Sequence, residues 1–413
     1  MNKFCISPWI HVNILPDGGV TPCCEFNRVD KNNQIKNDIG FFEKTNILPC
    51  FGSLHKNSLK EIWNNQKFKD FRLDMINGNE SNGCINCYRD EINGKLSYRQ
   101  ILNDKFKHHF DKVQLTENDG TFEYLNLIYW DFRFDNNCNF KCRMCGPELS
   151  SSWVNEVKKN FDIDYSVPKL NFDQHLEDID PLLDIVEEIY FAGGEPLISE
   201  EHYKILKKLI KHKKYHIPIN YNTNFSILTY KNIHIFDIWK KFKNVNVNIS
   251  VDGIGDRGEL IRNGFKWNDF VSNVIDLKEK AHCVKFIITA TVQALNCLHI
   301  FDLHKELFSL GIIDNVDDFT FSYVLEPNFL SISIIPDDLR KEVCNKTVEH
   351  IKNFLIPNNS TTSIENFNSL INFVNNENKQ YLLPKFLKYT DALDQIRNEN
   401  TKLIFPEISM LWE

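Results

Sequence analysis

The sequence predicts an α/β protein in which a partial barrel of six strand–helix units lies between a small cysteine-rich module and a helical extension. Three observations lead to this prediction: six of the twelve cysteines lie in the first 90 residues, strand-like and helix-like segments alternate from about residue 124, and residues from about 337 onward have helical periodicity. Such alternation builds parallel βαβ units with right-handed crossovers. We therefore expect three regions, at residues 1–105, 120–330 and 331–413.

The N-terminal region is expected to begin with a β-hairpin. Residues 8–24 fit two strands around an Asp-Gly turn, a dipeptide that favours tight hairpin turns. A helix over residues 58–77 would follow, and the polar run 116–120 marks the link to the next region. The cysteines that the hairpin and the helix would bring together are Cys5, Cys23, Cys84 and Cys87.

The barrel region is justified by its hydrophobic periodicity. The expected strands are residues 124–135, 188–192, 217–222, 245–251, 284–292 and 318–324. The expected helices are residues 148–160, 201–211, 231–242, 267–280 and 301–311. Ligands of such sheets bind at the carboxyl ends of the strands, where several polar and cysteine-containing segments of this chain fall.

Composition and charge narrow the functional class. With 413 residues, 42% hydrophobic and 25% charged, the chain has the composition of a globular protein. A formal net charge of −8 disfavours a large nucleic-acid footprint, which needs a basic face. We expect no membrane association, because no apolar stretch approaches the roughly 20 residues that span a bilayer. Twelve cysteines without a secretory signal indicate metal binding in a reducing compartment, so we expect a cytoplasmic protein.

The strongest motif is a loop of three cysteines after the first expected barrel strand. Cys138, Cys142 and Cys145 follow the spacing Cys-x3-Cys-x2-Cys. Three thiolates can hold one four-iron cubane, which leaves one iron without a protein ligand. An open metal position is typical of a site that binds and activates a ligand. The spacing alone also allows a zinc site.

On this loop the chain resembles the radical S-adenosylmethionine (SAM) superfamily. The resemblance implies that the open iron chelates the amino and carboxylate groups of SAM. It also implies that an electron from the cluster cleaves the sulfonium C–S bond, giving methionine and a 5′-deoxyadenosyl radical that abstracts hydrogen from a substrate. One mild departure is Met144, which stands where the superfamily often has an aromatic residue.

Further residues downstream carry the same resemblance. Gly193, Gly194, Glu195 and Pro196 match the Gly-Gly-Glu-Pro motif whose backbone holds the SAM amino group. The resemblance also implies SAM contacts by Asn222, Ser250, Asp252, Arg262 and Gln293. The alternatives are turn or capping roles for these polar residues, and Arg257 competes with Arg262.

The N-terminal cysteines resemble the twitch module, a shortened relative of the SPASM domain that usually follows the barrel. The resemblance implies a second, fully ligated [4Fe-4S] cluster held by Cys5, Cys23, Cys84 and Cys87. Counting from Gly18 selects Cys23, but counting from Gly19 selects Cys24, and Cys50 has no place in the pattern. The alternative is a zinc ribbon, because Cys-x2-Cys pairs also bind zinc.

Together these resemblances imply a radical SAM enzyme with an auxiliary cluster that assists oxidation or bond formation. The implied substrate is a peptide or a small polar metabolite, and the implied partner is an external reductant such as flavodoxin or ferredoxin. One alternative is nucleic-acid base modification, which the acidic charge disfavours. Another is a non-catalytic iron–sulfur or zinc protein, which would not need the Gly-Gly-Glu-Pro segment.

Overall fold

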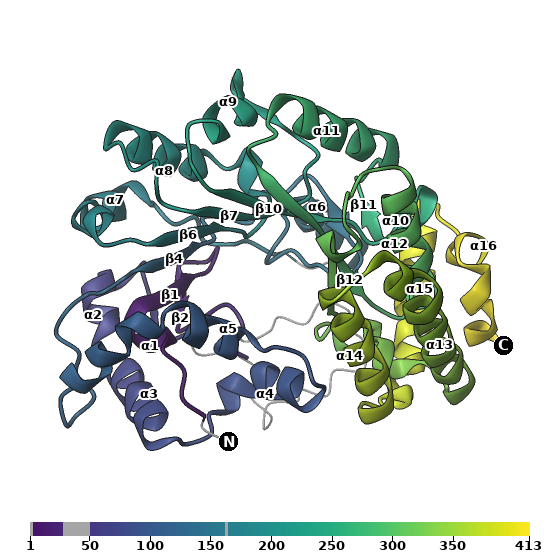
Figure 1. The fold of residues 1–413 in the computed structure, drawn as a ribbon, viewed down its shortest axis with the longest axis horizontal. Helices are drawn as coiled ribbons and strands as arrows, with labels where there is room; N and C mark the ends of the chain where they lie inside the picture. Colours follow the sequence, from purple (N-terminus) through teal and green to yellow (C-terminus); the bar gives the residue numbers. More distant parts are fainter. Residues whose placement is uncertain (1–2, 28–49, 162–163) are drawn as a thin grey trace.

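The computed structural model describes residues 3–27, 50–161 and 164–413. Six parallel strands form the barrel unit: β4 (Tyr129–Phe132), β6 (Glu188–Phe191), β7 (Ile219–Thr223), β10 (Val245–Ser250), β12 (Lys285–Val292) and β13 (Phe319–Tyr323). Three N-terminal strands continue the sheet: β1 (His11–Ile14), β2 (Gly19–Thr21) and β3 (Gly52–Ser53). The full order is β13-β12-β10-β7-β6-β4-β1-β2-β3 (Figure 1). The predicted partial (β/α)6 barrel is thereby confirmed.

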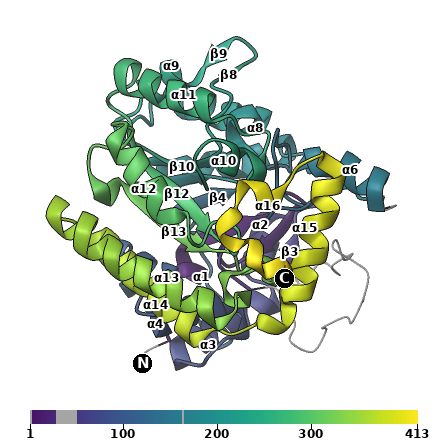
Figure 2. The ribbon, with the colours of Figure 1, turned by 90° about the vertical axis from the view of Figure 1, so that its right-hand side faces the viewer.

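Helices follow the barrel strands and cover the outer face of the sheet (Figure 1). They are α8 (Glu200–Lys211), α9 (Ile235–Trp239), α11 (Trp267–Lys280) and α12 (Ile300–Ser309). Helix α6 (Ser151–Phe161) instead follows the cysteine loop and lies apart from this layer (Figure 2). The helix expected over residues 231–242 is shorter than predicted. Its first residues instead form β9 (Ile233–His234), which pairs with β8 (Thr229–Tyr230).

The two faces of the barrel strands differ in polarity, as the period of two along a strand requires. Apolar residues such as Tyr221 and Val247 are fully buried on the helix-covered face. The inner face carries asparagines that pair across neighbouring strands. Asn248 Nδ2 donates to Asn222 Oδ1 at 2.8 Å. Two residues earlier on each strand, Asn246 Nδ2 donates to Asn220 Oδ1 in the same way. The barrel interior is therefore a polar surface suited to a polar ligand.

The N-terminal module is built onto the edge of the barrel. β1 pairs in parallel with β4, so Asn13 lies opposite Asp131, and β1 and β2 form the expected antiparallel hairpin. The start of the predicted hairpin is instead a helical turn, α1 (Ser7–Ile10), where Pro8 occupies an early position that suits proline. The helix expected over residues 58–77 is divided into α2 (Leu59–Trp63) and α3 (Gln66–Asn77), because the Asn65 side chain caps α3.

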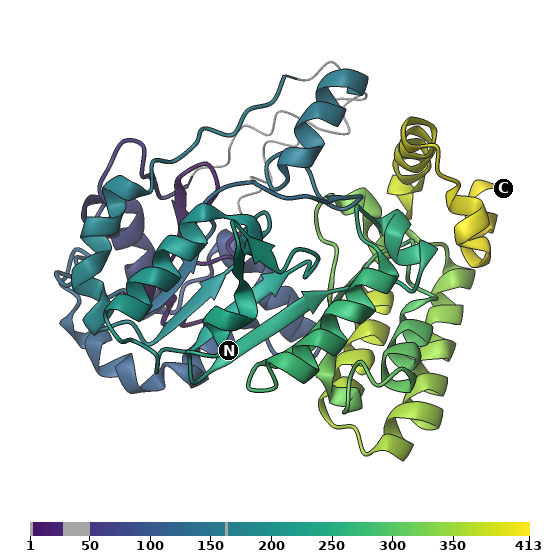
Figure 3. The same cartoon turned by 90° about the horizontal axis from the view of Figure 1, so that it is seen from above.

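The C-terminal extension is helical, as predicted, and gathers beside β13 (Figures 2 and 3). Its main helices are α13 (Asp337–His350), α14 (Thr362–Asn376), α15 (Leu383–Arg397) and α16 (Thr401–Ile404). The turn after α4 (Ile85–Ile92) touches α14: Asn372 and Asn376 each donate a hydrogen bond of 2.9 Å to Asn93. The first and last regions of the chain thus meet across the side that the barrel strands leave open.

Candidate active site and cluster-binding cysteines

One cavity of about 290 Å³ opens at the carboxyl ends of the barrel strands. Cys138, Cys142 and Cys145 all line it. Other predicted site residues on its wall are Gly193, Gly194, Glu195, Asn222, Ser250 and Arg262. The structure therefore brings together, around one cavity, most of the residues that the sequence singled out.

Short backbone contacts fix the cysteine loop. Cys142 lies in β5 (Lys141–Cys142), which pairs antiparallel with β11 (Arg262–Asn263), so that Arg262 is the direct partner of Cys142. The Cys145 amide donates to the Cys142 carbonyl at 3.0 Å. The Phe140 amide donates to Cys138 Sγ at 3.5 Å, which is an interaction suited to a thiolate ligand.

The thiols of the cysteine loop lie near one another without forming a compact trio. Burial first, and then the Cys142 thiol, raise the pKa of Cys138 to about 12, so these thiols lie close enough to interact. Yet among the twelve cysteines, all within the described residues, no three Sγ atoms lie within 4.8 Å of one another. Four sulfurs around one zinc, at bonds of about 2.3 Å, would be about 3.8 Å apart. The wider spacing suits a larger, four-iron group.

The two glycines of the Gly-Gly-Glu-Pro segment pack against the cysteine loop. Gly194 approaches so closely that a Cβ there would lie 2.3 Å from the Asn137 carbonyl oxygen, and Gly193 has a φ of +119°. The Glu195 amide donates to that Asn137 carbonyl at 2.7 Å. Side chains at these positions would separate the turn from the loop, which explains the need for glycine.

Glu195 joins the ends of two barrel strands. Glu195 itself follows the end of β6. Its carboxylate accepts hydrogen bonds at the end of β7, from the Thr223 hydroxyl at 2.6 Å and from the Asn224 amide at 2.7 Å. It also accepts from the Leu197 amide at 3.0 Å. Burial nevertheless raises the pKa of Glu195 to about 7, because the side chain is only 2% exposed. Pro196 follows as the first residue of a 3₁₀ turn and is buried.

Arg262 faces the cavity and is held from behind by Asp252. Arg262 Nε lies 2.7 Å from Asp252 Oδ2, and Asp252 Oδ1 also accepts from the Thr291 amide at 2.7 Å. Among the described residues, the cavity wall includes Arg262 and Thr291 but neither Asp252 nor Gln293, both of which are fully buried. The structure thus gives Asp252 a supporting position behind Arg262.

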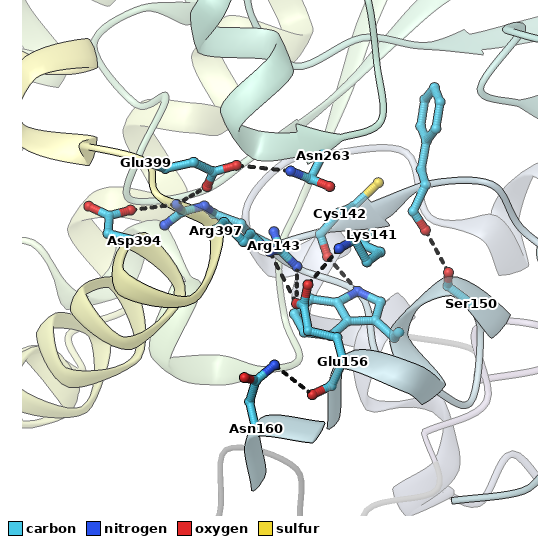
Figure 4. Close-up of polar contacts among 12 residues, drawn as sticks. Lys141, Cys142, Arg143, Ser150, Glu156, Asn160, Asn263, Asp394, Arg397 and Glu399 are labelled. Atoms are coloured by element: carbon cyan, nitrogen blue, oxygen red, sulfur yellow. Dashed lines mark hydrogen bonds and ion pairs between the residues drawn. The ribbon is translucent and has the colours of Figure 1, made fainter. Parts of the chain in front are cut away.

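The C-terminal extension clamps the cysteine loop through Arg143, which lies between Cys142 and Cys145 (Figure 4). Arg143 Nη2 is 2.5 Å from both Asp394 Oδ1 and Glu399 Oε2, and its side chain is 1% exposed. The Tyr389 hydroxyl donates to the Arg143 carbonyl at 2.7 Å. Helix α15 and the residues that follow it therefore hold both the side chain and the backbone of the loop.

A second ion-pair network joins the same helix to α6 (Figure 4). Arg397 donates two hydrogen bonds to Glu156 Oε1, and Lys141 donates to Glu156 Oε2 at 2.6 Å. The Arg397 guanidinium lies 4.5 Å from the Trp153 ring, and the Trp153 indole donates to the Cys142 carbonyl at 3.0 Å. No sequence motif pointed to this clamp, because its partners lie about 240 to 260 residues apart in the chain.

The four N-terminal cysteines predicted as ligands converge from three segments. Cys5 precedes α1, Cys23 follows β2, and Cys84 and Cys87 lie at the start of α4. Burial first, and then the thiols of Cys24, Cys87, Cys5 and Cys84, raise the pKa of Cys23 well above its ordinary value. Burial is also the main cause that raises the pKa of Cys5 to about 12 and of Cys84 to about 11. Four mutually close thiols can ligate a second cluster, since metal binding displaces their protons.

Cys24 has different neighbours from Cys23. Its pKa is raised first by burial and then by Asp131 and Glu25, while Arg133 and a hydrogen bond with Tyr98 lower it. The side chain therefore faces the barrel interior. Cys50 has a third environment, in which its Sγ packs against Gly19 of the hairpin. Of the two alternatives that the sequence left open, the geometry favours Cys23 over Cys24 as the fourth ligand.

The cavity wall also includes residues that were not predicted as site residues, among them Arg133, Tyr190 and Asn224. Arg133 and Tyr190 line the wall nearest the N-terminal module, and Asn224 Nδ2 lies 4.0 Å from Cys138 Sγ. Arg133 could have been found from its position two residues after Asp131, because alternate residues of a strand share one face. Arg133 Nε lies 3.4 Å from Asp131 Oδ1.

Comparison with known families agrees with this geometry. Residues 5–88 match SPASM, described as an iron–sulfur cluster-binding domain, and residues 133–291 match the radical SAM superfamily. No curated protein matches the chain significantly. No helix in the described part of the chain has both the length and the apolar character needed to cross a bilayer.

Among solved structures, the chain is similar to native anSMEcpe with bound AdoMet and Cp18Cys peptide, at 21% identity and a TM-score of 0.38, over 55% of this chain and 60% of that chain. It is also similar to TYW1 with a lysine-pyruvate adduct bound, at 14% identity and a TM-score of 0.30, over 55% of this chain and 71% of that chain. The aligned part thus spans about three fifths of the first of these proteins. The chain therefore carries a radical SAM domain, which contains the cysteine-lined cavity, and a SPASM-type iron–sulfur cluster-binding domain ahead of it.

Proposed function

We propose that this protein is an enzyme that reductively cleaves SAM at a [4Fe-4S] cluster held by Cys138, Cys142 and Cys145. The observation that carries the proposal is that these three thiols share one cavity with the Gly-Gly-Glu turn and Arg262. When bound, the cluster supplies the electron that cleaves the sulfonium C–S bond, and the resulting 5′-deoxyadenosyl radical abstracts hydrogen from the substrate. The fourth iron would face the cavity, because the three cysteines occupy only the loop side.

The cavity residues would then hold SAM. Arg262 is suited to the SAM carboxylate, since Asp252 fixes the guanidinium from the rear and leaves its front to the cavity. The exposed backbone of Gly193 and Gly194 is suited to the amino group. Asn222 and Ser250, on the polar inner face, are suited to the ribose hydroxyls. Of the expected SAM contacts, Gln293 receives less support from the geometry than Asn222, Ser250 and Arg262, because it does not line the cavity.

Cys5, Cys23, Cys84 and Cys87 would hold the auxiliary [4Fe-4S] cluster. A cluster with four protein ligands has no open iron, so it suits electron transfer or substrate positioning. We propose that it accepts or relays an electron during oxidation or bond formation. An external reductant such as flavodoxin or ferredoxin would supply the first electron. Thiolate ligands and reduced clusters suit the reducing conditions of the cytoplasm.

The substrate would lie between the SAM cavity and the N-terminal module, beside Arg133 and Tyr190. Both residues line the cavity, and the contact of Arg133 with Asp131 is made by Nε at 3.4 Å, so the terminal nitrogens of the guanidinium would be able to bind a ligand. Such a fork binds carboxylate or other anionic groups. A peptide and a small polar metabolite both fit this chemistry, and the two remain equally favoured.

The test is product formation by the reconstituted protein. After anaerobic reconstitution with iron and sulfide, addition of dithionite and SAM should yield 5′-deoxyadenosine, and Cys142→Ala should abolish it. Iron content should be about eight atoms per chain, as two cubanes require. If no 5′-deoxyadenosine forms, the protein is a non-catalytic metal protein. If each chain contains about four irons and one zinc, the N-terminal cysteines form a zinc ribbon instead of an auxiliary cluster.

A further inference from the structure

Two adjacent histidines converge on one carboxylate at the end of the barrel remote from the SAM cavity. His109 Nε2 lies 2.8 Å from Glu187 Oε1, and His108 Nε2 lies 2.9 Å from Glu187 Oε2. The three groups each offer a ligand atom, and these atoms all lie within 4.8 Å of one another. Side chains of successive residues normally diverge, so their convergence on one carboxylate is a distinct feature of this site.

These residues belong to different parts of the fold. His108 and His109 lie in a 3₁₀ segment, η2 (Lys107–Leu115), that leads out of the N-terminal module. Glu187 directly precedes β6, and so lies at the amino end of the barrel strands. The radical SAM cavity lies at their carboxyl ends. The site is therefore separate from both cysteine clusters.

A second cavity of about 440 Å³ adjoins the trio. His109 and Glu187 line it, as do His216 and Asp184, two further residues of types that bind metals. The one cation on this wall, within the described residues, is Lys112, and its ammonium donates to Asn126 Oδ1 at 2.9 Å. The space in front of the trio thus has room for a water or a further ligand.

We propose that His108, His109 and Glu187 bind one divalent transition-metal ion such as Zn²⁺. Two imidazoles and a carboxylate are a common donor set for such ions, with the remaining position open to water. Ligands bonded at about 2.0–2.2 Å lie about 3.4 Å apart in a tetrahedron. The two histidine–carboxylate contacts of 2.8 and 2.9 Å and the 4.8 Å limit on the trio lie on either side of this distance, so small side-chain shifts would form the site. The His108 side chain is 55% exposed, so the ion can reach the site from solvent. The His109 side chain is 10% exposed, so the bound ion would be partly shielded from water.

The consequence is a link between the auxiliary module and the barrel. The ligands are 78 and 79 residues apart in sequence, and the ion would bind them together only in the folded chain. Such a ligand stabilises the folded state in proportion to the logarithm of its concentration over Kd. The ion would thereby fasten η2, the segment that leads out of the N-terminal module, to the residue that precedes β6.

The test uses protein loaded with both clusters in zinc-free buffer. After exposure to a slight excess of Zn²⁺ and gel filtration, the wild type should retain about one zinc per chain with its iron content unchanged. Glu187→Gln and His109→Gln should each weaken zinc binding at least tenfold. His108→Gln, at an exposed position, should do so without risk to folding. The matched control is His282→Gln, an exposed histidine elsewhere, which should retain zinc.

The ligands themselves are checked by X-ray absorption at the zinc edge. Only nitrogen and oxygen neighbours at about 2.0 Å are expected. The proposal is overturned if no zinc is retained, in which case the trio is a hydrogen-bonded ion pair only. It is equally overturned if the variants retain zinc, if zinc enters only as iron leaves, or if sulfur appears at about 2.3 Å.

Discussion

The two groups of cysteines are assembled in different ways. The radical SAM cysteines come from one loop of eight residues, Cys138 to Cys145, which is held from outside by the Gly-Gly-Glu turn and the C-terminal clamp. The auxiliary cysteines come from three segments between Cys5 and Cys87, which only the folded module brings together. A local loop with external supports can leave one side open to a ligand, whereas ligands that converge from all sides close a site. The difference in assembly thus matches the proposed difference in function.

The largest expected effect tests which cysteines close the auxiliary site. Cys23→Ala should remove one cubane, so that iron falls from about eight to about four per chain. The neighbouring variant Cys24→Ala should keep about eight, because after burial the groups that most raise the pKa of Cys24 are Asp131 and Glu25, whereas Cys23 interacts with Cys5, Cys84 and Cys87. Iron and sulfide analysis of the two purified variants distinguishes Cys23 from Cys24 as the fourth ligand. Equal iron loss in both variants would contradict the assignment of Cys23.

The next effect concerns the external support of the radical SAM loop. Asp394→Asn combined with Glu399→Gln removes both anionic partners of the buried Arg143 guanidinium. Removing the partners of a buried charge costs about 3–5 kcal/mol, so the loop should loosen and lose its cluster first. Iron analysis of the purified variant should show the loss of about four irons per chain. The cluster that remains should not respond to SAM, because it is the auxiliary one.

The matched control for the clamp is Glu407→Gln. Glu407 also joins the C-terminal extension to the barrel, through Arg257, but it is 20% exposed and does not touch the cysteine loop. Because this pair is more exposed than Arg143 and lies away from the cysteine loop, cluster retention should not change. Equal iron loss in the control and in the clamp variant would show that the extension acts on stability in general.

A pH-dependent effect is expected at Glu195, which fastens the Gly-Gly-Glu turn. Burial raises its pKa from 4.5 to about 7, so the folded protein holds this proton to a higher pH than the unfolded chain does. Its contribution to stability is full below pH 4.5 and is lost as the pH rises through 7, by about 3 kcal/mol. Urea unfolding of Glu195→Gln should lack this component between pH 5 and 8. Parallel pH profiles for the variant and the wild type would contradict the assignment.

The smallest effect tests the hairpin that brings Cys5 and Cys23 together. Gly18 has a φ of +75°, and a Cβ there would lie 2.9 Å from His55 Cδ2. Gly18→Ala should therefore lower the free energy of unfolding by about 1–2 kcal/mol. Thermal melts monitored at the auxiliary cluster should show this loss, whereas Gly78→Ala, also at positive φ but with open space around it, should show only the backbone part.

The sequence anticipated the local features of the molecule well. Hydrophobic periodicity predicted all six barrel strands, and the spacing of Cys138, Cys142 and Cys145 marked the loop at the end of the first one. These features depend on residues close together in the chain. The choice between Cys23 and Cys24 could not be made, because it depends on which side chain turns toward Cys84 and Cys87 in the folded module.

The long-range contacts could not be predicted for the same physical reason. Arg143 reads in the sequence as an ordinary basic residue of the cysteine loop, and only folding places Asp394 and Glu399 beside it. The pairing of β1 with β4, which merges the N-terminal module with the barrel sheet, likewise joins strands about 118 residues apart. No periodicity or spacing records such contacts.

The most direct test of the account is electron paramagnetic resonance of two single-cluster variants, reduced and measured with and without SAM. Cys23→Ala should retain only the radical SAM cluster, and its reduced signal should shift when SAM is added, because one iron is open. Cys142→Ala should retain only the auxiliary cluster, and its signal should not change. A SAM-dependent shift in Cys142→Ala, or none in Cys23→Ala, would contradict the assignment of one open and one closed site.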